Sequence, residues 1–253
     1  MKPISIRGTP AKFPLICAPL IGTNRDALLA EGAAARVAGA DIVEWRVDHF
    51  GSISHAEEVI GTGRALRGSL SGLPLLFTRR SAAEGGHPVP ISDSQVVELY
   101  SAVCADGLAD LVDFEMGSGT REMRAVRDVS RRHGVGLICS FHDFDRTPPM
   151  AELGAQFRRA QELGGDVAKV SVMARAPEDA LALLAATLEA SRTLEIPLVG
   201  VSMGPHGALS RMLGFAFGSA LTFGVAAGSS APGQMPIGEL RAAIYLARKA
   251  LGG

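Results

Sequence analysis

Residues 14–47 read PLICAPLIGTNRDALLAEGAAARVAGADIVEWRV: an apolar run, a helical segment and a second apolar run. The runs Pro14–Leu20 and Asp41–Val47 are short and nearly continuous in apolar residues, as expected of strands that a parallel sheet buries on both faces. The segment Arg25–Ala38 between them has helical periodicity. Its apolar or small face consists of Leu28, Leu29, Gly32 and Ala35. This order of elements predicts one β–α–β unit.

The same alternation continues along the chain. The eight candidate strands are Pro14–Leu20, Asp41–Val47, Pro74–Thr78, Asp110–Glu115, Gly136–Phe141, Val167–Val172, Pro197–Met203 and Ala220–Gly224. Eight strands that alternate with helical segments indicate a parallel α/β architecture. Their spacing is regular and no linker divides the chain. We therefore expect a single (β/α)8 TIM barrel domain over residues 1–253, in preference to two α/β halves. Residues 1–13 would form an N-terminal extension that closes the barrel bottom.

The helical segments carry terminal signals of their own. Thr23 and Asn24 can cap the helix that starts at Arg25. Pro177 suits the first position of a helix over Pro177–Arg192, where its missing N–H costs nothing. The expected apolar face of that second helix consists of Ala180, Leu181, Leu184 and Leu188.

Composition limits the functions to consider. The chain has a formal net charge of −1 and 47% apolar residues, so it lacks the net basic balance of nucleic-acid or membrane-surface proteins. Its three cysteines match no zinc or CxxC spacing and are expected to be buried, reduced thiols. The N-terminus does not have the apolar stretch of a signal peptide, and no run is long enough for a membrane helix. We expect a cytoplasmic protein.

Polar residues gather where the predicted strands end, which is the rim that carries chemistry in such barrels. They are Glu44, Arg46, Asp48 and His49; Thr78, Arg79, Arg80, Ser81 and Glu84; Asp113 and Glu115; Ser140, His142 and Asp143; Lys169; Ser202 and Arg211; and the loop Ser229–Gln234. Charged groups that converge in this way are costly unless they pair or bind something.

Lys169 stands out among them. Only four of the 25 basic residues are lysines, and this one alone lies inside an apolar strand. Burial disfavours the ammonium form, which makes a nucleophilic neutral amine accessible, as in Schiff-base lysines. A structural ion pair with an inward carboxylate is an equal alternative from strand position alone.

His142 ends the neighbouring strand, where an imidazole could move the protons that imine chemistry requires. Alone, it would more simply be a histidine held by a backbone carbonyl; beside Lys169 we favour the acid–base role. We expect His49 to pack beside Phe50. The remaining histidines, expected to be solvated, are His55, His87, His133 and His206.

Three arginines at the rim, Arg46, Arg80 and Arg211, suit the binding of a carboxylate. Pairing with nearby carboxylates such as Glu44, Asp48 or Glu84 is the alternative, and we expect both to contribute. We do not expect a metal site, because no His-x-His or HExxH spacing occurs and the arginines would repel a cation. The sequence has no glycine-rich phosphate motif.

Seven motifs, in order along nearly the whole chain, resemble type I 3-dehydroquinate dehydratase. They are Glu44–Asp48 (EWRVD), Phe77–Gly86 (FTRRSAAEGG), Ser140–Phe144 (SFHDF), Ala168–Val170 (AKV), Ser210-Arg211, Phe217–Ala220 (FGSA) and Ser230–Gln234 (SAPGQ). The resemblance implies a lyase of the shikimate pathway of aromatic amino acid biosynthesis. It would dehydrate 3-dehydroquinate, a small carboxylate, to 3-dehydroshikimate, without a cofactor and commonly as a homodimer.

Carried over by position, the resemblance assigns a role to each site residue. Lys169 would be the Schiff-base lysine, His142 the general acid/base and Glu84 its associated carboxylate. Arg211 would bind the substrate carboxylate. The other substrate-binding positions would be Glu44, Arg46, Arg80, Ser230 and Gln234, the last two on a loop that closes over the ligand. Pro19 departs from relatives that have serine there, which removes one peripheral hydrogen bond.

Two other functions remain as alternatives. One is another Schiff-base barrel enzyme of the aldolase type, which usually needs a phosphate site that is not evident here. The other is a catalytically inactive barrel that serves as a binding module, for which the loss of Lys169, His142 or Glu84 would be expected; all three are present.

Overall fold

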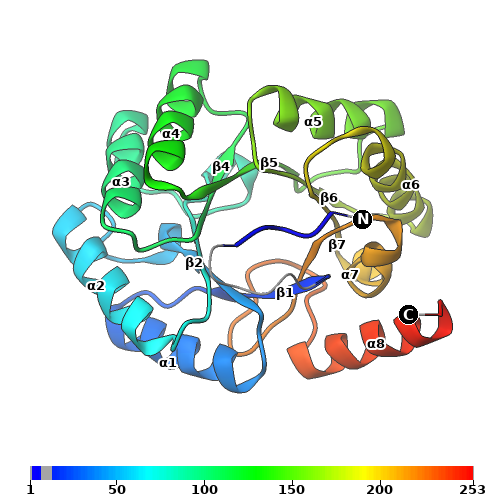
Figure 1. The fold of residues 1–253 in the computed structure, drawn as a ribbon, viewed down its shortest axis with the longest axis horizontal. Coiled ribbons are helices and arrows are strands. Elements are labelled where there is room, and N and C mark those ends of the chain that lie inside the picture. The colour runs from blue at the N-terminus through cyan, green and yellow to red at the C-terminus, as the bar shows by residue number, and fades with distance from the viewer. Residues whose placement is uncertain (1, 7–12, 253) are drawn as a thin grey trace.

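The computed structural model describes residues 2–6 and 13–252, and it shows eight parallel strands surrounded by helices (Figure 1). The strands are β1 (Leu15–Leu20), β2 (Ile42–Arg46), β3 (Leu75–Thr78), β4 (Leu111–Glu115), β5 (Gly136–Asp143), β6 (Val167–Met173), β7 (Leu198–Met203) and β8 (Leu221–Phe223). Their order is β7-β6-β5-β4-β3-β2-β1-β8. A parallel bridge between Leu198 and Ser219 joins β7 to the residues before β8 and closes the barrel. The predicted barrel is confirmed.

The α-helices of the described chain form the outer ring in Figure 1. They are α1 (Arg25–Val37), α2 (Ala56–Ser69), α3 (Asp93–Ala105), α4 (Thr120–His133), α5 (Met150–Glu162), α6 (Pro177–Thr193), α7 (Ala208–Leu213) and α8 (Ile237–Ala250). The side chain of Asn24 caps α1 by accepting a hydrogen bond from the N–H of Ala27 (3.0 Å). None of the helices in the described ranges has both the length and the apolar character needed to cross a membrane.

The predicted helix faces are right for α1 and partly wrong for α6. Leu28, Gly32 and Ala35 are buried on α1 as expected. On α6, Ala180 and Leu184 are buried, but Leu181 is 64% exposed. The buried stripe instead continues through Leu183, Thr187 and Ala190. The cause is close packing on β7, because a Cβ at Gly200 would come within 2.3 Å of the Thr187 hydroxyl. That contact fixes the rotation of the helix.

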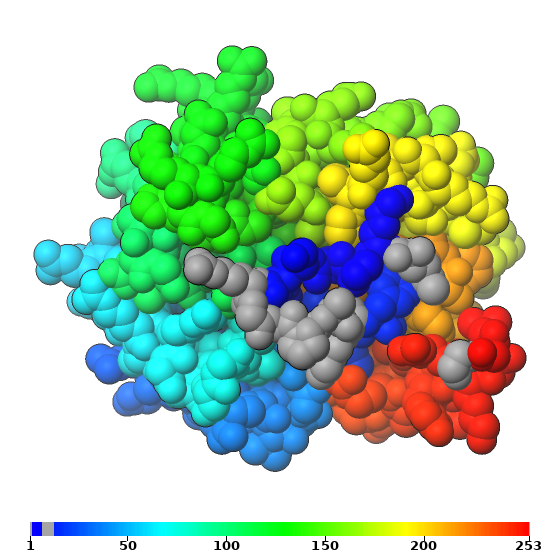
Figure 2. Space-filling model, viewed as in Figure 1, coloured from blue at the N-terminus to red at the C-terminus, as the bar shows by residue number. Residues whose placement is uncertain are grey.

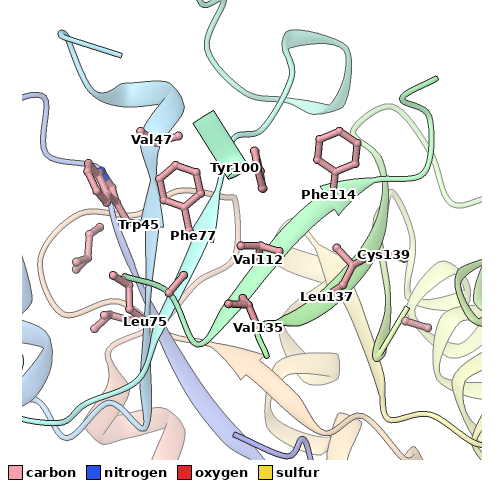
Figure 3. Close-up of a cluster of buried hydrophobic side chains, with 14 of the residues drawn as sticks. Trp45, Val47, Leu75, Phe77, Tyr100, Val112, Phe114, Val135, Leu137 and Cys139 are labelled. Atoms are coloured by element: carbon pink, nitrogen blue, oxygen red, sulfur yellow. The ribbon is translucent and has the colours of Figure 1, made fainter. Parts of the chain in front are cut away.

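Four aromatic side chains stack in a row between strands and helices (Figure 3). The rings of Trp45, Phe77, Tyr100 and Phe114 meet edge to face, with neighbouring centroids 5.3–5.6 Å apart. The Tyr100 hydroxyl donates to the backbone oxygen of Asp113 (2.7 Å) and accepts from the N–H of Arg79 (2.8 Å). The stack therefore holds the ends of β3 and β4 together.

A second core fills the barrel at the amino ends of the strands. Ile4 and Ile6 are buried there in one cluster with Leu15, Ile42 and Val167. Figure 2 shows the N-terminal residues in dark blue over the middle of this face. Of the extension expected over residues 1–13, residues 1 and 7–12 lie outside the described residues.

Replacing Tyr100 by Phe keeps the ring stack but removes both hydroxyl hydrogen bonds. We expect the free energy of unfolding to fall by about 1–3 kcal/mol, because buried backbone groups lose a partner. Urea denaturation measures it. The control is Thr120→Val at the exposed start of α4, where we expect a change below about 0.5 kcal/mol. Equal unfolding midpoints for the two variants would contradict the bracing role of Tyr100.

Candidate active site

A cavity opens at the carboxyl ends of the strands. It brings together all nine residues that the sequence singled out for the site. These are Glu44, Arg46, Arg80, Glu84, His142, Lys169, Arg211, Ser230 and Gln234. The remaining lining residues are Phe144, Ser171, Val201, Met203, Phe223 and Ala231. The cavity is thus charged on the side of β2 and β3 and largely apolar on the side of β7 and β8.

Lys169 points from β6 into this cavity and is 4% exposed. Its Nζ donates to Oδ2 of Asp113 (2.8 Å), lies 3.7 Å from Oε1 of Glu44 and sits 4.9 Å from the centre of the Phe223 ring. The ion pair considered from the sequence is therefore present. It does not block the amine, which still lines the open cavity. The position of Lys169 therefore allows both roles considered from the sequence, the structural ion pair and the nucleophilic amine.

Asp113 is the centre of the charge network beneath the cavity. Its Oδ1 accepts from Arg80 (2.7 Å) and from the Ser140 hydroxyl (2.6 Å), while Oδ2 accepts from Lys169. Burial alone would raise the pKa of Asp113, but the positive charges of Arg80 and Lys169 outweigh it and hold the pKa well below its usual range. Asp113 is therefore a permanent anion between two buried cations.

Arg80 is almost fully enclosed by acceptors. Besides Asp113, its guanidinium reaches Glu115 (3.1 Å), the Ser140 hydroxyl (2.9 Å) and Glu84 (3.6 Å). Burial would lower the pKa of Arg80, but these carboxylates raise it above its usual value. Of the two alternatives raised for the arginines, charge pairing accounts for the contacts of Arg80.

Arg46 also pairs within the protein. It forms two parallel hydrogen bonds to Asp48, from Nε at 2.9 Å and from the terminal nitrogen at 2.8 Å. Asp48 further accepts from the backbone N–H groups of Arg80 and His87 (3.2 and 3.1 Å). Although burial opposes it, the contact with Arg46 lowers the pKa of Asp48. Asp48 thus fixes the guanidinium of Arg46 at the cavity edge.

His142 and Glu84 form a hydrogen-bonded pair at the cavity. Nδ1 of His142 lies 2.8 Å from Oε2 of Glu84, and Nε2 has no partner among the described residues. Burial, together with Arg80 and Lys169, keeps the pKa of His142 well below 6.5. Burial likewise raises the pKa of Glu84, to about 8. Both shifts favour a pair in which neither group is charged. In the tautomer that carries its hydrogen on Nδ1 and donates it to Glu84, Nε2 is free to accept a proton.

Arg211 is the cation of the cavity that has no carboxylate at ion-pair distance among the described residues. It is 2% exposed and donates to the backbone oxygen of Pro232 (2.9 Å), while its buried Nε has no partner. Burial lowers the pKa of Arg211 to about 10. Thr222 of β8 anchors it through a hydrogen bond to its backbone oxygen (2.9 Å). A buried guanidinium with an unused donor is chemically suited to contact an anion.

The loop after β8 covers this arginine. The side-chain oxygen of Gln234 accepts from the backbone N–H of Ser230 (3.0 Å), and its amide nitrogen donates to the Ser230 hydroxyl (3.3 Å). Gly233 has φ of 79° and lies against the backbone of Gly204, an approach that a Cβ would prevent. Hydrogen bonds within the loop therefore stabilise its turn and hold Ser230 and Gln234 at the cavity.

Three residues of the predicted rim have a supporting role that the family resemblance did not assign. Asp113, Ser140 and Asp48 hold the cations in place, as described above. The signal for Asp113 was the run LVDFE, in which two carboxylates alternate and so face the barrel interior together. His49 is outside the cavity; it packs against the ring of His87 (centroids 4.2 Å apart), while Phe50 packs on Trp45. In residues 2–6 and 13–252, no three His, Cys, Asp or Glu side chains are grouped to hold a metal ion.

The fold and the cavity together define a class: a (β/α)8 barrel enzyme with a buried lysine beside an imidazole. Residues 16–250 match the family model of type I 3-dehydroquinase. The chain belongs to this family of hydro-lyases.

Relatives with this fold and sequence are similar over their full length. The 3-dehydroquinate dehydratase of Albidiferax ferrireducens is 47% identical over 99% of this chain and 96% of its own. The crystal structure of the Geobacillus kaustophilus 3-dehydroquinate dehydratase has a TM-score of 0.95 and 42% identity, covering 98% of this chain and 97% of that one. The type I enzyme from Clostridium difficile, solved with covalently modified comenic acid, has a TM-score of 0.93 and 37% identity, covering 99% and 100%.

The raised pKa of Glu84 makes stability depend on pH in a defined direction. The carboxyl group ionises near 4.5 in an unfolded chain and near 8 in the fold, so the wild type loses stability as pH rises through this window. Glu84→Gln removes the titration. We expect the variant to gain stability relative to wild type between these two values, as measured by urea denaturation at stepped pH. The exposed Glu58→Gln should show no such trend, and a flat or falling difference for Glu84→Gln would contradict the account.

Proposed function

We propose that this chain eliminates water from 3-dehydroquinate to give 3-dehydroshikimate through a Schiff base on Lys169. The observation that carries the proposal is one cavity in which the amine of Lys169, the free Nε2 of His142 and the unpaired guanidinium of Arg211 all meet. The family assignment favours dehydration over the aldolase-type and inactive-module alternatives.

The first stage forms the imine. The neutral imidazole of His142 takes a proton from the Lys169 ammonium group, and the free amine attacks the ring ketone. The resulting carbinolamine loses its hydroxyl as water, with a proton that His142 returns. The C=N bond that forms is cationic. Asp113, which lies 2.8 Å from Nζ and stays ionised, stabilises that cation in place of the ammonium charge it replaces.

The second stage eliminates water. The cationic imine acidifies the adjacent carbon, and His142 removes a proton from it to give an enamine. The enamine electrons form a C=C bond as the β-hydroxyl leaves, and that hydroxyl takes its proton from His142. Hydrolysis of the conjugated imine then frees the product and Lys169. Glu84 holds the imidazole through Nδ1 during each transfer.

Binding depends on the charged groups around the ring. Arg211 takes the substrate carboxylate, because its guanidinium is buried, has no carboxylate partner among the described residues and keeps an unused donor at Nε. Arg46 has one terminal nitrogen left after pairing with Asp48, and Glu44 can accept from a ring hydroxyl. Ser230 and Gln234 close over the ligand from the loop. For Arg80 we propose a smaller part in binding, through the charge it places beside Glu84 and Asp113.

The resemblance also implies a homodimer in the cytoplasm, and we propose both for this chain. The exposed apolar side chains Leu209, Tyr245 and Leu246, on the neighbouring helices α7 and α8, support a covered surface. We further propose that the chain is one domain and that residues 2–6 of its N-terminal extension close the barrel bottom. The burial of Ile4 and Ile6 supports this.

Lys169→Ala should lower kcat by several orders of magnitude, because no other group can form the imine. Lys169→Arg should not restore activity, since a guanidinium keeps the charge but is not a nucleophile. The measurement is the rise in enone absorbance with 3-dehydroquinate as substrate. Lys249→Ala, a lysine at the exposed end of α8, is the control and should turn over like wild type. Near-normal turnover in Lys169→Ala would refute the proposed function.

Arg211→Ala should lower kcat/KM by about 10–100-fold, the effect of losing a charge-assisted contact to the substrate carboxylate. Steady-state kinetics with 3-dehydroquinate measure this change. Arg158→Ala, on an exposed face of α5, is the matched arginine control. An Arg211 variant with the kinetics of the control would show that the carboxylate binds elsewhere.

A further inference from the structure

Ser171 is a buried hydroxyl of the cavity that takes no part in the steps proposed for Lys169, His142 and Arg211. It lies on β6 two residues after Lys169, so both side chains face the barrel interior. It is 4% exposed and makes no hydrogen bond to another described residue. By contrast Ser140, which pairs with Lys169 across β5 and β6, donates to Asp113 (2.6 Å). A hydroxyl that is buried, unpartnered and open to a cavity is available to a ligand.

The register of the sheet places Ser171 between two functional groups. On one side, it pairs with His142 of β5. On the other side it pairs with Val201 of β7, the strand that leads into α7 and Arg211. Adjacent strands lie roughly 4.8 Å apart, so the hydroxyl and the imidazole stand side by side on one wall. The other lining residues of β7 and β8 are apolar: Val201, Met203 and Phe223.

The chemistry of the proposed substrate indicates which of its groups would face Ser171. In 3-dehydroquinate the carbon that bears the carboxylate also bears the hydroxyl that leaves, and the adjacent carbon gives up the proton. With the carboxylate on Arg211 and the proton facing His142, the leaving hydroxyl falls between them, against β6. Ser171 provides the hydroxyl on that wall.

We propose that Ser171 binds the departing oxygen of the substrate and holds it beside His142. During elimination the C–O bond breaks with its electron pair, the oxygen takes a proton from His142, and Ser171 donates a hydrogen bond to it without itself losing a proton. The contact strengthens as negative charge develops on the oxygen, so it acts on the elimination step more than on substrate binding. This inference rests on the proposed function of the same cavity.

The test compares Ser171→Thr with Ser171→Val, which have the same shape and differ in the hydroxyl, and includes Ser171→Ala. The hydroxyl-free variants should lose about tenfold in kcat with little change in KM, the effect of one lost hydrogen bond to the reacting group. Ser171→Thr should stay close to wild type. Equal kcat values for the Thr and Val variants would overturn the role of Ser171.

A second readout locates the affected step. Borohydride added during turnover reduces the imines, and mass spectrometry separates substrate adducts from product adducts, which are lighter by one water. Ser171→Val and Ser171→Ala should shift the adducts toward the substrate form, and Ser171→Thr should not. An unchanged ratio in Ser171→Val, with normal adducts in wild type, would overturn this inference alone. Absence of any adduct in wild type would overturn the proposed function as well.

Discussion

The buried carboxylate of Asp113 is the interaction on which the rest of the site depends. It compensates two cations that would otherwise be costly to bury, Lys169 and Arg80. Because both cations are paired, the cavity can keep a lysine away from water and still leave its amine open to a ligand. The aromatic stack that ends at Phe114 and the Tyr100 hydroxyl hold the backbone of Asp113 in place. The packing of aromatic side chains between the strands and the helices thus fixes the position of the Asp113 carboxylate inside the barrel.

The charges of the cavity are strongly asymmetric. Carboxylates gather on β2 to β4 and pair with Arg46, Arg80 and Lys169, whereas Arg211 stands unpaired beyond an apolar wall. In the proposed function, this distribution of charge draws the anionic substrate to the Arg211 end of the cavity and leaves its ketone over the amine of Lys169. The same asymmetry keeps His142 neutral, since burial and the nearby cations both lower its pKa. One distribution of charge thus accounts both for the proposed orientation of the substrate and for the neutral state of the His142 imidazole.

Much of the fold and of the cavity could be predicted from the sequence. A parallel barrel buries its strands on both faces, so each strand appears in the sequence as a run of apolar residues. All eight strands were predicted within a few residues, and so was the rim that gathers Lys169, His142 and Arg211. The face of α6 was assigned wrongly at Leu181, since its rotation depends on the contact of Thr187 with Gly200. The sequence could not predict which carboxylates pair with Arg80, or that Asp113 lies at the centre of the charge network. Both depend on which inward side chains meet across neighbouring strands.

The account rests on the covalent bond that Lys169 is proposed to form, and one measurement tests it most directly. The enzyme is incubated with 3-dehydroshikimate, reduced with borohydride and digested, and its peptides are weighed. The account predicts that the peptide containing Lys169 gains the mass of the reduced product, while the peptides of Lys2, Lys12 and Lys249 do not. An unmodified Lys169 peptide from enzyme that still dehydrates 3-dehydroquinate would contradict it.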